Sequence, residues 1–226
     1  MGIMSIERKE HLFWLGRYCE RVHTTCRCLI WYLDTMIDED AEAYRVFCGK
    51  LRLDREYASR EEFISGFLFD EKDPNSVFSS LVNAFDNGVV LRDELTGETL
   101  AYLQLAIDSL RHDRENAAPL LKLQPVIDDL YAFWGSADEN VADWMSLAMM
   151  KCGKNIERLD LYIRLGYRTE TVKDEFRKLR SLLEHMEGER IYDPEALTLI
   201  SEYVMDTVSW LADPFPVLEA INRCIL

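Results

Sequence analysis

Apolar residues recur at every third or fourth position along most of the chain, which is the spacing of one face of an α-helix. The clearest case is the segment 5–36. Its apolar face contains Leu12, Leu15, Cys19 and Val22. No segment shows the alternation of apolar and polar residues that predicts a strand. The pattern therefore predicts an all-α fold, a helical bundle.

The same pattern returns in residues 137–167, and a constant offset relates the two segments. Gly16 aligns with Gly153 and Glu20 with Glu157, since each pair is separated by 137 positions. Both copies read Gly-Arg/Lys-x-x-Glu-Arg. An internal repeat of this kind predicts two structurally equivalent elements.

Both motif helices carry apolar residues nearly all round, which predicts that they lie at the centre of the bundle. Glycine in a helix interior costs about 1 kcal/mol relative to alanine, so glycines at equivalent places indicate a close approach of two backbones. A buried glutamate needs a cationic partner. We therefore predict two pseudo-symmetric central helices, with Glu20 paired to Arg158 and Glu157 paired to Arg21.

These pairs define a candidate polar centre. It also includes other cations of the two motif helices and one arginine from the segment between them. Its predicted members are Arg17, Glu20, Arg21, Arg27, Arg92, Lys154, Glu157, Arg158 and Arg164. Arginine forms bidentate pairs with carboxylates and phosphates, so the centre could bind a peptide or a small acidic ligand. Alternatively, each arginine is already paired with a neighbouring carboxylate, and the cluster serves only the structure.

A metal site is a second possible use of the same residues. The Glu-x-x-His spacing found in di-iron carboxylate bundles occurs at Glu20 and His23, and Glu157 and Asp160 occupy the equivalent positions. These four residues would make the protein a dinuclear metal oxidase. The arginine that follows each glutamate competes for the same carboxylate, which favours an ion-pair network. We predict that the protein has no cofactor.

Helix-capping patterns predict where several helices begin and end. One helix is expected over Ala41–Tyr57, and the Asp73-Pro74 pair predicts the start of another. A helix is expected to end at Gly135. The pattern Ser136-x-x-Glu139 is a capping box, which predicts the start of the second motif helix.

The composition excludes some partners. The chain has 226 residues and a net charge of −15, which disfavours nucleic acid and anionic membrane surfaces. Its apolar segments are shorter than a membrane span, so no membrane association is expected. The six scattered cysteines are expected to be reduced thiols in a cytoplasmic protein. The length suits a single domain over residues 1–226.

The motifs resemble those of a known family. The segments Leu12–Arg21 and Gly153–Arg158 are similar to the doubled Glu-Arg motif of the alpha-E family, a group of bacterial all-helical proteins. Asp86–Glu98 resembles the central run of this family, and Trp134–Trp144 resembles the approach to the second motif.

This resemblance implies a role as well as a fold. Alpha-E proteins are commonly found with circularly permuted ATP-grasp ligases and transglutaminase-like proteins. The resemblance therefore implies an accessory or substrate-presenting component of a peptide-forming or peptide-modifying amidoligase system. Its partner would be the ligase or the transglutaminase-like protein, and it would not be catalytic alone. A purely structural interaction module is a further alternative.

Overall fold

The computed structural model describes residues 4–112, 120–186, 191–206 and 213–225, and these residues form ten α-helices. The helices are α1 (Ile6–Asp38), α2 (Ala43–Leu51), α3 (Arg60–Phe69), α4 (Val77–Val90), α5 (Gly97–His112), α6 (Leu120–Asn140), α7 (Trp144–Leu165), α8 (Thr169–His185), α9 (Pro194–Met205) and α10 (Phe215–Arg223). Among the described residues, the one β-type pairing is an isolated bridge between Tyr192 and Ile225. The predicted all-α fold is confirmed.

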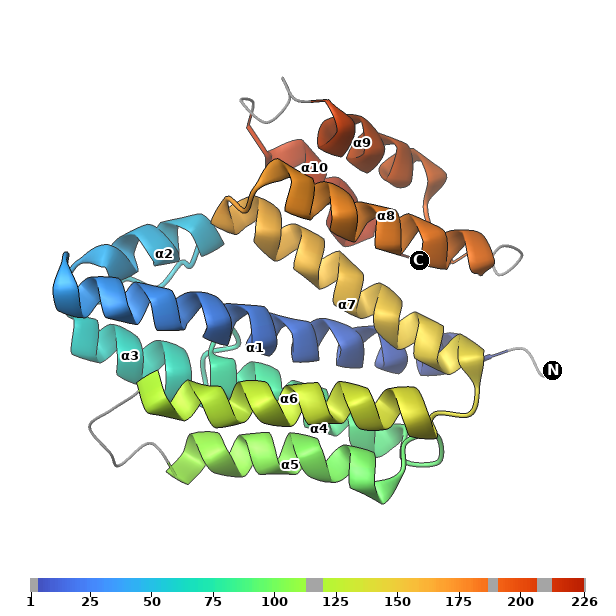
Figure 1. The fold of residues 1–226 in the computed structure, drawn as a ribbon, viewed down its shortest axis with the longest axis horizontal. Coiled ribbons are helices and arrows are strands. Elements are labelled where there is room, and N and C mark those ends of the chain that lie inside the picture. Colours follow the sequence, from blue (N-terminus) through green and yellow to red (C-terminus); the bar gives the residue numbers. More distant parts are fainter. Residues whose placement is uncertain (1–3, 113–119, 187–190, 207–212, 226) are drawn as a thin grey trace.

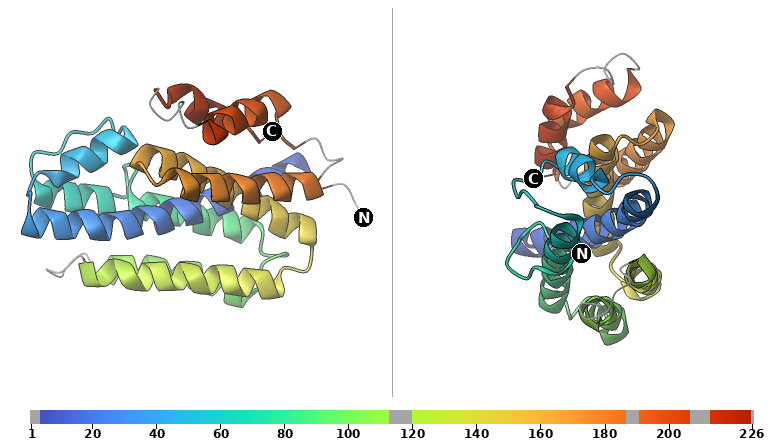
Figure 2. Two further views of the ribbon diagram at one scale, coloured as in Figure 1. Left: turned by 45° about the horizontal axis from the view of Figure 1, so that its top comes forward. Right: turned by 90° about the vertical axis from the view of Figure 1, so that its left-hand side faces the viewer.

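Helix α1 runs through the middle of the molecule (Figure 1). It packs against α4 and α6 on one side and against α7 on the other, and α2 contacts both α1 and α7. Helix α5 covers α4 and α6, whereas α8 and α10 lie on α7 and α9 packs on them. The two further views show the same layers (Figure 2). The two motif helices, α1 and α7, are therefore the central pair, as predicted.

Helices α1 and α7 run in the same direction, cross, and then diverge (Figure 1). Their backbones are in close contact at Gly16 and Gly153. A Cβ atom on Gly16 would lie 2.0 Å from the carbonyl oxygen of Met150. A Cβ atom on Gly153 would lie 2.0 Å from the carbonyl oxygen of Phe13. The 137-residue offset relates Gly16 to Gly153 and Phe13 to Met150, so the two contacts are equivalent. The crossing therefore has the predicted pseudo-twofold symmetry, and glycine is required on both helices.

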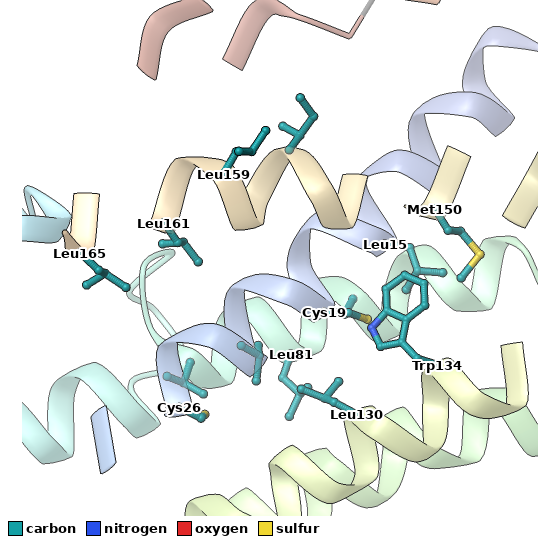
Figure 3. Close-up of a cluster of buried hydrophobic side chains, with 14 of the residues drawn as sticks. Leu15, Cys19, Cys26, Leu81, Leu130, Trp134, Met150, Leu159, Leu161 and Leu165 are labelled. Carbon is teal, nitrogen blue, oxygen red and sulfur yellow. The ribbon is translucent and has the colours of Figure 1, made fainter. Parts of the chain in front are cut away.

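Apolar side chains from α1, α4 and α6 fill the space on the side of α1 away from the C-terminal helices (Figure 3). Leu15 and Cys19 of α1 are fully buried, as are Leu81 of α4 and Leu130 of α6. Burial of such side chains is the main favourable contribution to folding.

The motif helices are less completely buried than their composition indicates. Trp31 on α1 is 61% exposed and Trp144 at the start of α7 is 46% exposed. Trp14 is 38% exposed and lies against the guanidinium of Arg17. The apolar composition of these helices thus includes aromatic residues that remain at the surface.

The start of the second motif helix was predicted incorrectly. Helix α6 continues through Gly135 to Asn140, and Ser136 lies inside it with its hydroxyl bonded to Thr99. The repeat helix α7 begins at Trp144, where the side chain of Asp143 accepts a hydrogen bond from the backbone of the first turn. The helical part of the second repeat is therefore 144–165, not 137–167.

Two other boundaries also differ from the prediction. Helix α2 ends at Leu51, well before Tyr57, because Arg52 adopts the left-handed conformation and closes the helix. Helix α4 begins at Val77 with Ser76 as its cap, whereas Asp73 caps the preceding turn through the backbone of Asn75.

Candidate ligand-binding site

The first ion pair joins the two motif helices. Arg158 Nε donates to Glu20 Oε1 at 2.8 Å, and Arg158 Nη2 donates to Glu20 Oε2 at 2.6 Å. The Thr24 hydroxyl donates to the same Oε1 at 2.5 Å. Glu20 is fully buried, so this bidentate pair compensates a charge that water does not reach. The predicted Glu20–Arg158 pair is confirmed.

The second ion pair is the symmetric mate of the first, with one addition. Arg21 Nε donates to Glu157 Oε1 at 2.6 Å, as predicted. Arg17 Nε also donates to Glu157 Oε2 at 2.6 Å. The buried carboxylate therefore holds two guanidinium groups, both from α1.

The symmetry is broken at Lys154, which is the counterpart of Arg17. Instead of reaching Glu20, its amino group lies 4.0 Å from the centroid of the Trp134 ring, a cation–π contact. Burial lowers the pKa of Lys154, and the nearby Arg158 lowers it further. His23 Nδ1 stands 3.6 Å from Glu20 Oε1, which is longer than a hydrogen bond.

Both glutamates are ionised at neutral pH. Burial opposes ionisation of Glu20, but His23 and the bidentate Arg158 outweigh it and lower its pKa to about 2. Burial likewise opposes ionisation of Glu157, and Arg21 and Arg17 lower its pKa. The pairs are therefore charged networks over the whole neutral range.

We expect acid to weaken the fold through Glu20. An ordinary glutamate has a pKa of 4.5, and the folded value is about 2. Because the folded pKa is the lower, the stabilisation is complete above pH 4.5 and is lost as the pH falls towards 2. The difference corresponds to about 3 kcal/mol. Chemical denaturation between pH 5 and pH 3 should show a shallower loss of stability in Glu20→Gln than in the wild type. An equal pH dependence of stability in the two proteins would contradict the lowered pKa of Glu20.

A pocket of about 310 Å³ opens beside the Glu157 pair, where α1 and α7 have diverged. It is lined by Arg17, Arg21, Thr25, Leu51, Arg52, Leu53, Phe67, Asn75, Glu157, Asp160, Leu161, Arg164 and Asn222. Four arginine charges less two carboxylate charges leave a net charge of +2 in this lining, although the whole chain carries −15.

Contacts between side chains fix the wall of this pocket. Arg164 Nε donates to Asp160 Oδ2 at 2.5 Å, and its Nη2 donates to Asp160 Oδ1 at 3.2 Å. Asn222 of α10 accepts from Arg17 Nη2 at 2.9 Å and donates to Asp160 Oδ1 at 3.2 Å. The wall is therefore held in place before any ligand arrives, which reduces the entropy lost on binding.

Comparison with known proteins places the chain in a family. A family model named Alpha-E, described as a predicted alpha-helical domain with a conserved ER motif, matches residues 7–204. The chain belongs to the Alpha-E family. No curated protein and no solved structure matches it.

The Alpha-E motif residues divide between the two sides of the helix crossing. The pocket side contains four of the predicted residues: Arg17, Arg21, Glu157 and Arg164. The opposite side contains the Glu20–Arg158 pair, and Lys154 lies against Trp134. The predicted single centre is therefore two ion-pair groups, of which one borders a pocket.

Two predicted residues lie elsewhere in this Alpha-E protein, and others were missed. Arg27 is exposed on α1, and Arg92 lines a separate pocket with Arg8. Arg52 and Asn222 line the pocket beside Glu157 but were not predicted, because their positions depend on where α2 ends and on how α10 packs. No motif in the sequence indicates either one.

The residues of the metal alternative do not form a ligand set in this Alpha-E protein. Both oxygens of Glu20 and both oxygens of Glu157 accept hydrogen bonds from guanidinium groups. Across the described ranges, no group of three or more His, Cys, Asp or Glu side chains has the arrangement of a metal site. Within the same ranges, no helix has the length and apolarity needed to cross a bilayer.

Proposed function

We propose that this Alpha-E protein is an accessory, substrate-presenting component of an amide-forming system. Its partner would be an ATP-grasp ligase or a transglutaminase-like protein, and it would hold an acidic group of the peptide that this partner modifies. The observation that carries the proposal is the positively charged pocket in an otherwise strongly acidic chain.

The hydrogen-bonding state of the arginines supports binding of an anion. Arg21 uses Nε for Glu157, and within the described structure its two terminal nitrogens have no hydrogen-bond partner. Arg17 and Arg164 each have one terminal nitrogen left over in the same way. Guanidinium groups that face a pocket with unused donors are suited to carboxylates.

The same geometry favours presentation of a substrate over catalysis by this chain. The carboxylates at the pocket, Glu157 and Asp160, are bound to arginines, so neither is poised to accept a proton. The chain also contains no glycine-rich phosphate-binding motif. A ligase partner would therefore supply the nucleotide chemistry.

Reconstitution tests the proposal. The protein is co-expressed with the ATP-grasp ligase of the same genome, and ADP release is measured with an acidic acceptor peptide. We expect amide formation to rise at least about tenfold when both proteins are present, the scale of a positioning effect. A ligase that is equally active alone, or a complex that forms without affecting the reaction, would instead support a structural interaction module.

A further inference from the structure

We infer that the pocket recognises a ligand with two separate carboxylates joined by a short apolar chain, and that Arg52 clamps the outer carboxylate. This rests on the proposed function, because it specifies which acidic group is presented. A C-terminal glutamate or aspartate of a peptide has this chemistry, and so does the free acidic amino acid.

The inner positive charge belongs to the Glu157 group. Arg17 and Arg21 share this one carboxylate, so one positive charge remains uncompensated at the inner end. Arg164 forms a bidentate pair with Asp160, which cancels both charges. The inner end therefore attracts one carboxylate.

The outer positive charge belongs to Arg52, which enters the pocket from the end of α2. It forms an ion pair with Asp213 at 3.7 Å, and this pair is weak because the side chains are 48% and 71% exposed. The guanidinium also lies 5.2 Å from the Phe215 ring centroid. One excess positive charge thus belongs to α1 and the other to Arg52 at the end of α2. This separation suits two carboxylates better than one compact phosphate.

The backbone of Arg52 is an independent observation. Its φ is 55° and ψ is 49°, the left-handed region, and no other non-glycine residue in the described ranges has a positive φ. Helix α7 ends in the same conformation but uses Gly166, the residue best suited to it. Strained residues cluster at binding sites. An arginine at a glycine position is therefore consistent with a role for its side chain.

The rest of the pocket lining matches the middle of such a ligand. Leu51, Leu53 and Phe67 contribute apolar surface for methylene groups. Asn75 and Thr25 supply amide and hydroxyl groups for a peptide bond or an amino group. A volume of about 310 Å³ is at the small end of the range for ligand pockets, which suits a ligand of one or two residues.

Calorimetric titration with small carboxylates tests the inference. The probes are glutarate, butyrate and inorganic phosphate at constant ionic strength. Glutarate should bind at least tenfold more tightly than butyrate, which lacks the second carboxylate, and more tightly than phosphate. Free glutamate and a peptide ending in glutamate distinguish the amino acid from the peptide as the source of the ligand, and the same peptide with an amidated C-terminus lacks the second carboxylate.

The variant Arg52→Gly separates ligand binding from stability. It should raise the melting temperature, because glycine suits the left-handed position, and lower glutarate affinity at least tenfold. Arg52→Lys keeps the strain and the charge and should lose less affinity. Unchanged glutarate affinity in Arg52→Gly, or equal affinity for butyrate and glutarate, would overturn the inference. If acidic peptides still bound in that case, the proposed function would stand. If no carboxylate bound, the proposed function would fall as well.

Discussion

Replacing Glu20 by alanine should lower the free energy of unfolding by about 3–5 kcal/mol. The bidentate partner Arg158 has a side chain only 17% exposed, so the substitution leaves a largely buried cation without its main carboxylate. Thr24 also loses the acceptor of its hydroxyl. Urea denaturation, analysed as a two-state transition, measures the difference.

The matched control is Glu39→Ala. Glu39 is exposed immediately after α1, and its structural contact is a backbone hydrogen bond that alanine retains. Its effect should be smaller than about 0.5 kcal/mol. Similar losses in the two variants would contradict a buried ion-pair network at Glu20.

Alanine at Gly16 should destabilise the fold by about 3 kcal/mol or more. The added methyl carbon would lie 2.0 Å from the backbone oxygen of Met150, and a backbone atom inside α7 cannot move aside independently. The two motif helices would have to separate, which disturbs both ion pairs as well as the packing. The measurement is again urea denaturation.

Gly135→Ala is the control for this substitution. Gly135 is exposed within α6, and a Cβ atom there would meet no atom within 4 Å. Alanine should therefore stabilise the protein by about 0.5–1 kcal/mol through helix propensity alone. A loss of stability in Gly16→Ala and a gain in Gly135→Ala would show that the helix crossing, and not helix propensity, determines the effect at Gly16. A small effect at Gly16 would contradict the close approach of α1 and α7.

The sequence predicted the centre of this fold because the repeat carries tertiary information. An equal offset between Gly16 and Gly153 and between Glu20 and Glu157 implies two equivalent helices. Burial of each glutamate then requires an arginine from the other copy. Both the glycine crossing and the two interhelical pairs follow from this reasoning and are present in the structure.

Other features could not be predicted because they depend on packing between distant segments. Ser136 and Glu139 match the sequence of a capping box, but Ser136 lies inside α6, where its hydroxyl is bonded to Thr99 of α5. Lys154 is the repeat counterpart of Arg17, yet its amino group lies against Trp134 of α6. Arg52 reaches the pocket because α2 ends early. Local sequence determines none of these three outcomes.

The two ion-pair groups also differ in what covers them. On the Glu20 side, Arg158 Nη1 lies 3.5 Å from Glu175 of α8, and His23 packs against Tyr131 of α6. On the Glu157 side, the side chain of Arg21 is 30% exposed at the pocket. A duplicated motif thus forms one group that is closed by α6 and α8 and one group that borders a pocket.

The affinity for an acidic peptide in wild type, Arg21→Lys and Arg27→Lys tests the central claim most directly. Lysine at position 21 keeps a cation beside Glu157 but removes the unused guanidinium donors, whereas Arg27 is exposed outside the pocket. Calorimetry at one ionic strength should show at least a tenfold loss for Arg21→Lys, about 1.4 kcal/mol, and no change for Arg27→Lys. Equal affinities in all three proteins would contradict a binding site at the Glu-Arg pocket.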